Sequence, residues 1–181
     1  MHNITFARIS EKNFDSNSMD EFLRYEKVSQ IWKNVDGEYI LSAAEYTIDW
    51  DLEKRRGIAK IILRTVLDGG FAFGAFEGDK VVGYILCTGK FFGSEDQYTE
   101  IALYHVSTHY RRMGIGKELF RLACIEAQNI GAKKLYISSG PTKNTQAAYR
   151  SLGCVPASEI NQAAVERNPA DIQLEYPLQS C

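Results

Sequence analysis

One segment constrains the fold of this chain more than any other: Arg111-Arg112-Met113-Gly114-Ile115-Gly116-Lys117. It lies between a predicted strand, residues 98–106, and a predicted helix, residues 117–130. Two glycines one residue apart permit a tight turn whose backbone N–H groups converge on one point. The helix that follows aims its N-terminal N–H groups and the positive end of its dipole at that point. The segment therefore predicts an anion site of pyrophosphate size, to which its three basic side chains add donors.

Two phosphate-binding motifs fail on these residues, and a third matches. A P-loop would need a glycine at Arg111 and a serine or threonine at Glu118. A dinucleotide-binding turn would need a third glycine at Leu119, after the first strand of a βαβ unit. Arg111, Gly114 and Gly116 match the coenzyme A loop of the GNAT acetyltransferases, Arg/Gln-x-x-Gly-x-Gly/Ala. Taken alone, six residues also fit a basic, glycine-rich helix start that arose by chance.

The resemblance to the GNAT family extends from about residue 71 to residue 155 and, more loosely, over most of the chain. Before the loop, residues 106–111 are similar to the family's Val-x-Pro-x-Tyr-Arg, with Thr108 in place of proline. After the loop come the family's asparagine, tyrosine, glycine and apolar strand, here Asn144, Tyr149, Gly153 and Val155. Residues 11–53 and 156–170 are the least constrained. The resemblance implies an α/β (α+β) fold in one domain, residues 1–181, with a central mixed, mainly antiparallel sheet flanked by helices.

Hydrophobic spacing predicts the order of helices and strands. Four apolar residues recur at roughly helical spacing and predict a helix over residues 20–33 that ends at Asp36-Gly37: Phe22, Leu23, Val28 and Ile31. Residues 39–50 are ambiguous. Two strands are predicted to flank a tight connection at residues 77–80. The other predicted elements are strands 4–9, 71–76, 81–88, 134–138 and 171–176 and helices 51–67 and 145–152.

Composition limits the class of protein and its partners. The chain has 181 residues, a net charge of −2 and four widely spaced cysteines. The near-neutral charge gives no reason to expect nucleic acid as a partner. Because no run approaches the ~20 apolar residues that span a bilayer, and no secretory signal is visible, we expect a cytoplasmic protein without a membrane partner. The cysteines predict neither a metal site nor a disulfide framework.

An acidic region precedes the loop. Residues 11–53 contain eleven acidic and four basic residues, which would suit a cationic substrate. Four aromatic residues lie among the carboxylates and could hold a cationic amine by cation–π contact: Trp32, Tyr39, Tyr46 and Trp50. Helix packing beside a solvated acidic face explains the same pattern. The acceptor therefore stays open between a small molecule and a peptide amine, and a homodimer also stays open.

The family resemblance also implies which residues bind the co-substrate, acetyl-CoA. The loop residues would hold its pyrophosphate, and Asn144 would contact it or merely cap a helix. Tyr104 and Val106 would pair with its amide-rich pantetheine arm, and an N–H near Val106 would stabilise the oxyanion. Tyr149 would act as general acid beside the coenzyme sulfur. A tyrosine that simply packs on an amphipathic helix is the alternative for Tyr149.

The resemblance further implies a general base, because an alkyl amine of pKa about 10.4 is mostly protonated at neutral pH. Glu100 is similar in position to the glutamate base of the histone acetyltransferase branch. Even spacing predicts that Glu100, Tyr104 and Val106 share one strand face. His105 would then point to the opposite face. A solvent-facing strand carboxylate is an equal alternative for Glu100.

Together, the loop and the resemblance predict an N-acetyltransferase that moves the acetyl group of acetyl-CoA to a primary amine. Direct attack in a ternary complex is expected, because Cys154 has no histidine partner in the sequence for a covalent route. The alternative is a non-catalytic module that binds acetyl-CoA or CoA on the same fold. An interaction protein built on that fold is a third reading.

Overall fold

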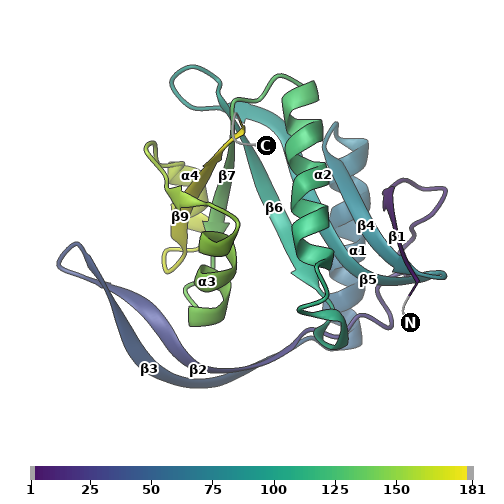
Figure 1. Ribbon diagram of the computed structural model, residues 1–181, viewed down its shortest axis with the longest axis horizontal. Helices are drawn as coiled ribbons and strands as arrows, with labels where there is room; N and C mark the ends of the chain where they lie inside the picture. The colour runs from purple at the N-terminus through teal and green to yellow at the C-terminus, as the bar shows by residue number, and fades with distance from the viewer. Residues whose placement is uncertain (1–2, 179–181) are drawn as a thin grey trace.

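A seven-stranded sheet forms the centre of the computed structural model, which describes residues 3–178 (Figure 1). Its strands, in spatial order, are β1 (Ile4–Arg8), β4 (Phe71–Glu77), β5 (Lys80–Phe92), β6 (Tyr98–Val106), β7 (Lys134–Ser139), β9 (Ile172–Pro177) and β8 (Val155–Pro156). Neighbouring strands are antiparallel except β6 and β7, which are parallel. The predicted mixed, mainly antiparallel sheet is therefore confirmed.

Two long helices cover the two faces of this sheet. In Figure 1, α1 (Leu52–Leu67) lies behind the strands and α2 (Ile115–Asn129) lies in front of them. Ile58 and Ile62 of α1 belong to one hydrophobic cluster, and Leu119 and Phe120 of α2 belong to another. Three shorter helical segments complete the chain: η1 (Thr108–Tyr110), α3 (Lys143–Ser151) and α4 (Gln162–Arg167). The predicted helices after residue 50 are confirmed with small shifts at their ends, whereas β8 and α4 add to the predicted order.

The helices begin in two different ways. Asp51 caps α1 by accepting a hydrogen bond from the Lys54 N–H at 2.7 Å. Thr142 caps α3 in the same way, through the Thr145 N–H. By contrast, α2 starts after Gly114 without a side-chain cap. The first N–H groups of α2 are therefore left for another acceptor.

The predicted helix over residues 20–33 is wrong, because this region forms a strand. β2 (Tyr25–Val35) pairs with β3 (Glu38–Asp49) in a separate antiparallel hairpin, which we call the arm. Along β2, Glu26 and Val28 are buried while Lys27 and Ser29 are exposed, so the burial period is two. Asp36 and Gly37, with φ of 53° and 92°, form the hairpin turn and do not end a helix.

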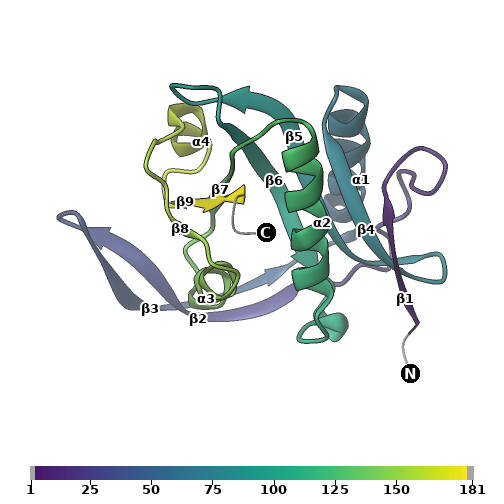
Figure 2. The ribbon, with the colours of Figure 1, turned by 45° about the horizontal axis from the view of Figure 1, so that its top comes forward.

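The arm is attached to the rest of the structure at one end, and its other end projects away from it (Figures 1 and 2). The N–H of Trp32 donates to the carbonyl of Pro141 at 2.8 Å, and Ile31 bridges to Thr142. The loop after β6 holds the chain just before β2, since the Thr108 N–H donates to the carbonyl of Leu23 at 2.8 Å. The base of the arm therefore joins the end of β6 to the start of α3.

A β-bulge in β6 reverses the predicted orientation of its side chains. Leu86 of β5 pairs with Leu103 and Cys87 pairs with Ile101, so Ala102 is the extra residue. Ile101 therefore shares the α2 face with Tyr104 and Val106. Glu100, one residue before Ile101, lies on the opposite face. The prediction that Glu100 shares a face with Tyr104 and Val106 is wrong, and His105 lies on the side of Glu100.

The strands β6 and β7 separate halfway along β6. They pair from Tyr98–Lys134 to Ile101–Ile137 and then diverge (Figure 1). The second half of β6 thus has one edge that β7 does not cover. We call the space between the two strands beyond Ile101 the opening.

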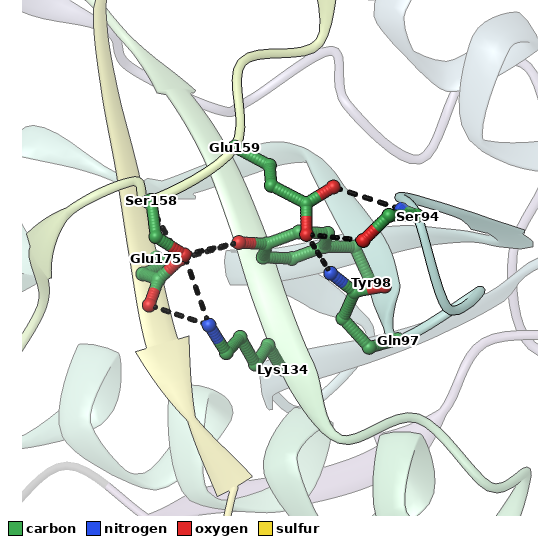
Figure 3. Close-up of polar contacts among 7 residues, drawn as sticks. All are labelled: Ser94, Gln97, Tyr98, Lys134, Ser158, Glu159 and Glu175. Carbon is green, nitrogen blue, oxygen red and sulfur yellow. Dashed lines mark hydrogen bonds and ion pairs between the residues drawn. The ribbon is translucent and has the colours of Figure 1, made fainter.

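A polar network fixes the segment before α4 to the sheet (Figure 3). Glu175 accepts hydrogen bonds from the Tyr98 hydroxyl, the Ser158 N–H at 2.9 Å and the Lys134 ammonium at 2.9 Å. Next to it, Glu159 accepts from the N–H and the hydroxyl of Ser94, both at 2.8 Å. The network holds α4, and with it Arg167, close to the start of β6.

Within residues 3–178, no helix has the length and apolarity needed to cross a membrane.

Candidate active site

Free backbone N–H groups mark the start of α2. Arg112 and Gly114 both adopt left-handed backbone, with φ of 65° and 80°, and turn the chain sharply into the helix. No acceptor within residues 3–178 takes the N–H of Gly114, Ile115 or Gly116. A β-carbon on Gly114 would meet no atom within 4 Å, so the space beside it is open. We call these three N–H groups the amide cup; their number and position suit an anion at a helix N-terminus.

The side chains around the amide cup are of two kinds. Arg112, Met113 and Lys117 are exposed on the outer side of the loop, whereas Ile115 is buried in the core. The Arg111 guanidinium turns inward, and its Nε donates to the carbonyl of Val106 at 3.3 Å. Burial lowers the pKa of Arg111, the charge of Arg24 lowers it further, and Glu26 opposes both. The structure thus brings all the predicted loop residues to one end of β6.

The backbone of Val106 faces the opening. The N–H of Ser107 donates to the carbonyl of Val82 on β5 at 2.8 Å. Because successive N–H groups along a strand point to opposite sides, the N–H and the carbonyl of Val106 point away from β5. The contact from Arg111 to the Val106 carbonyl agrees with this direction.

Tyr149 lies beside Tyr104 at the opening. The ring of Tyr149, on α3, has its centroid 5.9 Å from that of Tyr104, on β6. Tyr149 is 9% exposed. Burial, and next the neighbouring Tyr104 and Cys154, raise the pKa of its phenol, so it keeps its proton at neutral pH. Tyr149 therefore has a proton to donate on the α2 side of the sheet.

Glu100 lies on the other side of the sheet, one residue before the strands diverge. It is 7% exposed and forms an ion pair with Arg167 of α4 at 2.5 Å. Burial raises the pKa of Glu100, while the charge and hydrogen bond of Arg167 lower it. The structure therefore places a carboxylate and a phenol on opposite faces near one opening, and does not bring them into contact.

Asn144 contacts the arm. Its Nδ2 donates to Oε1 of Glu26 at 3.1 Å. Since Thr142 caps α3, the reading of Asn144 as the helix cap is wrong. Glu26 also pairs with Arg24, whose Nη1 lies 2.9 Å from Oε2. The sequence does not signal this buried pair, because residues 20–33 fit an amphipathic helix and residues 24–28, Arg-Tyr-Glu-Lys-Val, show no alternation of polar and apolar residues.

The four aromatic residues of the acidic region do not form one cage. Tyr39 and Tyr46 are exposed on the arm, at 46% and 44%. The guanidinium carbon of Arg150 lies over the ring of Trp32, 5.0 Å from the ring centroid, in a cation–π contact. Trp50 packs edge-on against His105, with 4.9 Å between the ring centroids. The prediction that these four residues could hold a cationic amine together is therefore wrong.

A model of the acetyltransferase (GNAT) family matches residues 13–154. The chain belongs to this family. Its structure is similar to that of nourseothricin acetyltransferase, with a TM-score of 0.71, 12% identity and coverage of 97% of this chain and 98% of the other. No curated protein sequence matches it.

Two further structures share the GNAT fold at low identity. A candidate streptothricin acetyltransferase of Bacillus anthracis, in complex with acetyl coenzyme A, has a TM-score of 0.64 and 14% identity, with 96% of each chain covered. An aminoglycoside 6'-N-acetyltransferase in complex with coenzyme A has a TM-score of 0.54 and 13% identity, with 70% of this chain and 81% of the other covered. The fold expected from the coenzyme A loop is thus confirmed. Membership of the family also identifies this protein as an acyltransferase.

Proposed function

We propose that this GNAT protein transfers the acetyl group of acetyl-CoA to a primary amine by direct attack in a ternary complex. The observation that supports this most is the amide cup, which lies at the end of the strand that borders the opening. Related structures contain acetyl coenzyme A or coenzyme A. The free donors of the cup and the open space beside Gly114 fit a pyrophosphate.

The chain would hold the co-substrate mainly through its backbone. Gly114, Ile115 and Gly116 donate N–H groups to the pyrophosphate, while Arg112 and Lys117 add positive charge from the exposed side of the loop. Tyr104 and Val106 present the uncovered edge of β6 to the amides of the pantetheine arm, as an added strand would require. Asn144 remains a proposed contact, provided that its amide is shared with Glu26 or released from it.

Besides a general base, two groups of the chain would act on the reacting atoms. Acetyl-CoA supplies the activated thioester. The N–H of Val106, directed into the opening, stabilises the negative charge that develops on the carbonyl oxygen. Tyr149 donates the proton of its hydroxyl to the sulfur of the leaving thiolate. Tyr149 lies on the α2 side of the opening, and the Val106 N–H is directed into the opening.

Glu100 is the proposed general base, and it would act from the face of the sheet opposite α2. It takes a proton from the acceptor ammonium, directly or through a water molecule. Its burial supports this role, because a carboxyl group with a raised pKa is closer to the pH at which it must accept the proton. Base and acid would then reach the opening from opposite faces of the sheet.

One observation favours a second candidate, a coenzyme A-binding module without turnover. Arg167 already occupies the carboxylate of Glu100 through an ion pair. Incubating the protein with acetyl-CoA and a panel of small-molecule and peptide amines, then measuring free thiol, separates the two. Thiol release above the amine-free background supports the acetyltransferase. Tight binding of acetyl-CoA without release for any amine supports the module, and absence of binding contradicts both.

A further inference from the structure

A mostly buried polar cluster lies beside the end of β6. Its members come from the base of the arm, from the strands β5 and β6 and from the loop: Arg24, Glu26, Tyr84, His105 and Arg111. Arg24, Glu26 and Tyr84 are only 7%, 9% and 0% exposed. His105 packs against Tyr84, with 5.8 Å between the ring centroids. We call this set the arginine cluster.

The arginine cluster has an excess of positive charge. Glu26 pairs with Arg24 at 2.9 Å, and no second carboxylate contacts either arginine within residues 3–178. His105 does not change the balance: burial lowers its pKa to about 3, with further contributions from Arg24 and Arg111, so it is neutral at pH 7. The cluster therefore has one carboxylate, paired with the buried Arg24, and a second guanidinium, that of the partly buried Arg111. A buried charge of this kind needs a partner of opposite sign.

Within residues 3–178, the Tyr84 hydroxyl lacks an acceptor, and Nη1 of Arg24 has none apart from its ion pair with Glu26. Nη1 of Arg24 and the hydroxyl of Tyr84 have no hydrogen-bond partner within the described part of the chain. The contact of Nη1 with Glu26 is an ion pair without hydrogen-bond geometry. Burial raises the pKa of Tyr84, so its hydroxyl stays protonated and can donate. Since both unsatisfied atoms are donors, the missing group is an acceptor.

The cluster lies beside the end of β6, close to the backbone of Val106. The Ser107 hydroxyl accepts the Leu23 N–H at 3.1 Å, which fixes Arg24 next to the end of β6. Val106, one residue before Ser107, directs its N–H into the opening. Glu26 also lines a polar pocket of about 30 Å³ together with Thr142 and Asn144. An anionic group held by Arg24 would thus keep the rest of its molecule near the reacting atoms.

We propose that the arginine cluster binds the carboxylate of the acceptor, so that the acceptor is an amine that also bears a carboxylate, such as an amino acid. This inference rests on the proposed acetyl transfer. A carboxylate offers two oxygens in one plane, which match the paired N–H donors of a guanidinium. Exposed carboxylates of the arm, such as Glu38 and Glu45, do not neutralise the cluster, so the acidity of residues 11–53 is no guide to the acceptor's charge.

The test compares amino acids with their carboxamides, which differ only in the charged group. Thiol release is measured for each pair with the unmodified protein, with Arg24→Gln and with Arg64→Gln. Arg64 is an exposed arginine paired with Asp68 on α1 and serves as the matched control. We expect the unmodified protein and the control to prefer the acid. In Arg24→Gln, the ratio of kcat/KM for acid over amide should fall by about 10- to 100-fold.

Several results would overturn the proposal. If Arg24→Gln lowers kcat/KM equally for the acid and the amide, Arg24 only supports the fold. If Arg24→Gln raises only the KM for acetyl-CoA, the cluster binds a phosphate of the co-substrate. Should Arg24→Gln fail to fold, Tyr84→Phe removes one unsatisfied donor, and the same ratio is then expected to fall by a smaller factor. An unchanged ratio in a folded Tyr84→Phe variant would count against the proposal.

A binding measurement separates this inference from the proposed function. Calorimetric titration of the protein with the same amino acids, without acetyl-CoA, measures their affinity for the carboxylate site in the absence of turnover. If no amine is acetylated but amino acids bind and Arg24→Gln abolishes binding, the acetyltransferase fails and the carboxylate site stands. If amines are acetylated with equal preference for acid and amide, the carboxylate site fails and the acetyltransferase stands.

Discussion

The hydroxyl oxygen of Tyr104 lies 2.7 Å from the position that a β-carbon would take on Gly116. This contact explains the second glycine of the loop, which is needed for space and not for an unusual backbone angle. The next nearest atoms, one on Tyr104 and one on Val106, lie at 3.6 Å, an ordinary contact distance. Removing the hydroxyl would therefore make room for a methyl group.

We accordingly expect Gly116→Ala to weaken acetyl-CoA binding about tenfold and to lower the free energy of unfolding by about 1–3 kcal/mol, since the start of α2 must shift. Adding Tyr104→Phe should restore most of the stability. Coenzyme titration and chemical denaturation measure the two effects. Gly57→Ala, which meets no atom within 4 Å in α1, is the matched control and should slightly stabilise the protein. A double variant as unstable as the single one would contradict the steric explanation.

Tyr149→Phe tests the proposed acid. The substitution keeps the buried ring beside Tyr104 and removes only the proton donor. We expect kcat to fall by about 100-fold with little change in the affinity for acetyl-CoA. Steady-state kinetics and direct coenzyme titration separate the two quantities, with Tyr39→Phe on the exposed arm as control. Equal losses in turnover and affinity would make Tyr149 a binding residue.

Local signals in the sequence predicted the loop and most of the sheet. The glycines at 114 and 116, the apolar face of α2 and the two-residue turn between β4 and β5 each depend on neighbours in the chain. Such features are readable because short-range geometry decides them. Tyr149, by contrast, was predicted only through the resemblance to the GNAT family, and its role stays a prediction.

The arm and the bulge were beyond that kind of reasoning. Arg24 and Glu26 face the domain although both are charged, so a pattern that assigns polar residues to the surface placed them wrongly. No glycine or proline marks the bulge at Ala102, yet this one residue moves Glu100 to the face opposite Tyr104. In both cases, contacts with residues distant in the sequence decide the local structure.

Arg167 should set the pH at which Glu100 can act as a base. Burial raises the pKa of Glu100 and Arg167 lowers it, so Arg167→Gln leaves the raising effect unopposed. A base works only when deprotonated, and the acidic limb of the kcat/KM profile should therefore move to higher pH. The rate above that limb should stay close to that of the unmodified protein. The pH dependence of initial rates, with exposed Arg64→Gln as control, measures the shift.

Glu100→Gln is expected to lower the rate at neutral pH and to recover part of it at high pH, where the amine loses its proton without help. Unchanged profiles in both Glu100→Gln and Arg167→Gln would remove Glu100 from the mechanism. The ion pair would then be a structural contact between α4 and β6.

Glu175 should stabilise the fold in a pH-dependent way. Burial alone would raise its pKa, but hydrogen bonds from Tyr98, Ser158 and Lys134 outweigh burial and lower the pKa to about 2, from a usual value of 4.5 (Figure 3). A carboxyl group with a depressed pKa in the folded state stabilises that state above its unfolded pKa. This contribution is lost as the pH falls from about 4.5 towards 2.

Glu175→Gln should therefore lower the free energy of unfolding at pH 7 by about 1–3 kcal/mol, because four donors, from Tyr98, Lys134 and Ser158, lose a charged acceptor. The difference from the unmodified protein should shrink between pH 5 and pH 3, as the native carboxylate becomes protonated on unfolding. Urea denaturation at pH 7, 5 and 3 measures it, with Glu38→Gln on the exposed arm as control. If the difference in free energy of unfolding stays constant from pH 7 to pH 3, Glu175 stabilises the fold through its shape and not through its charge.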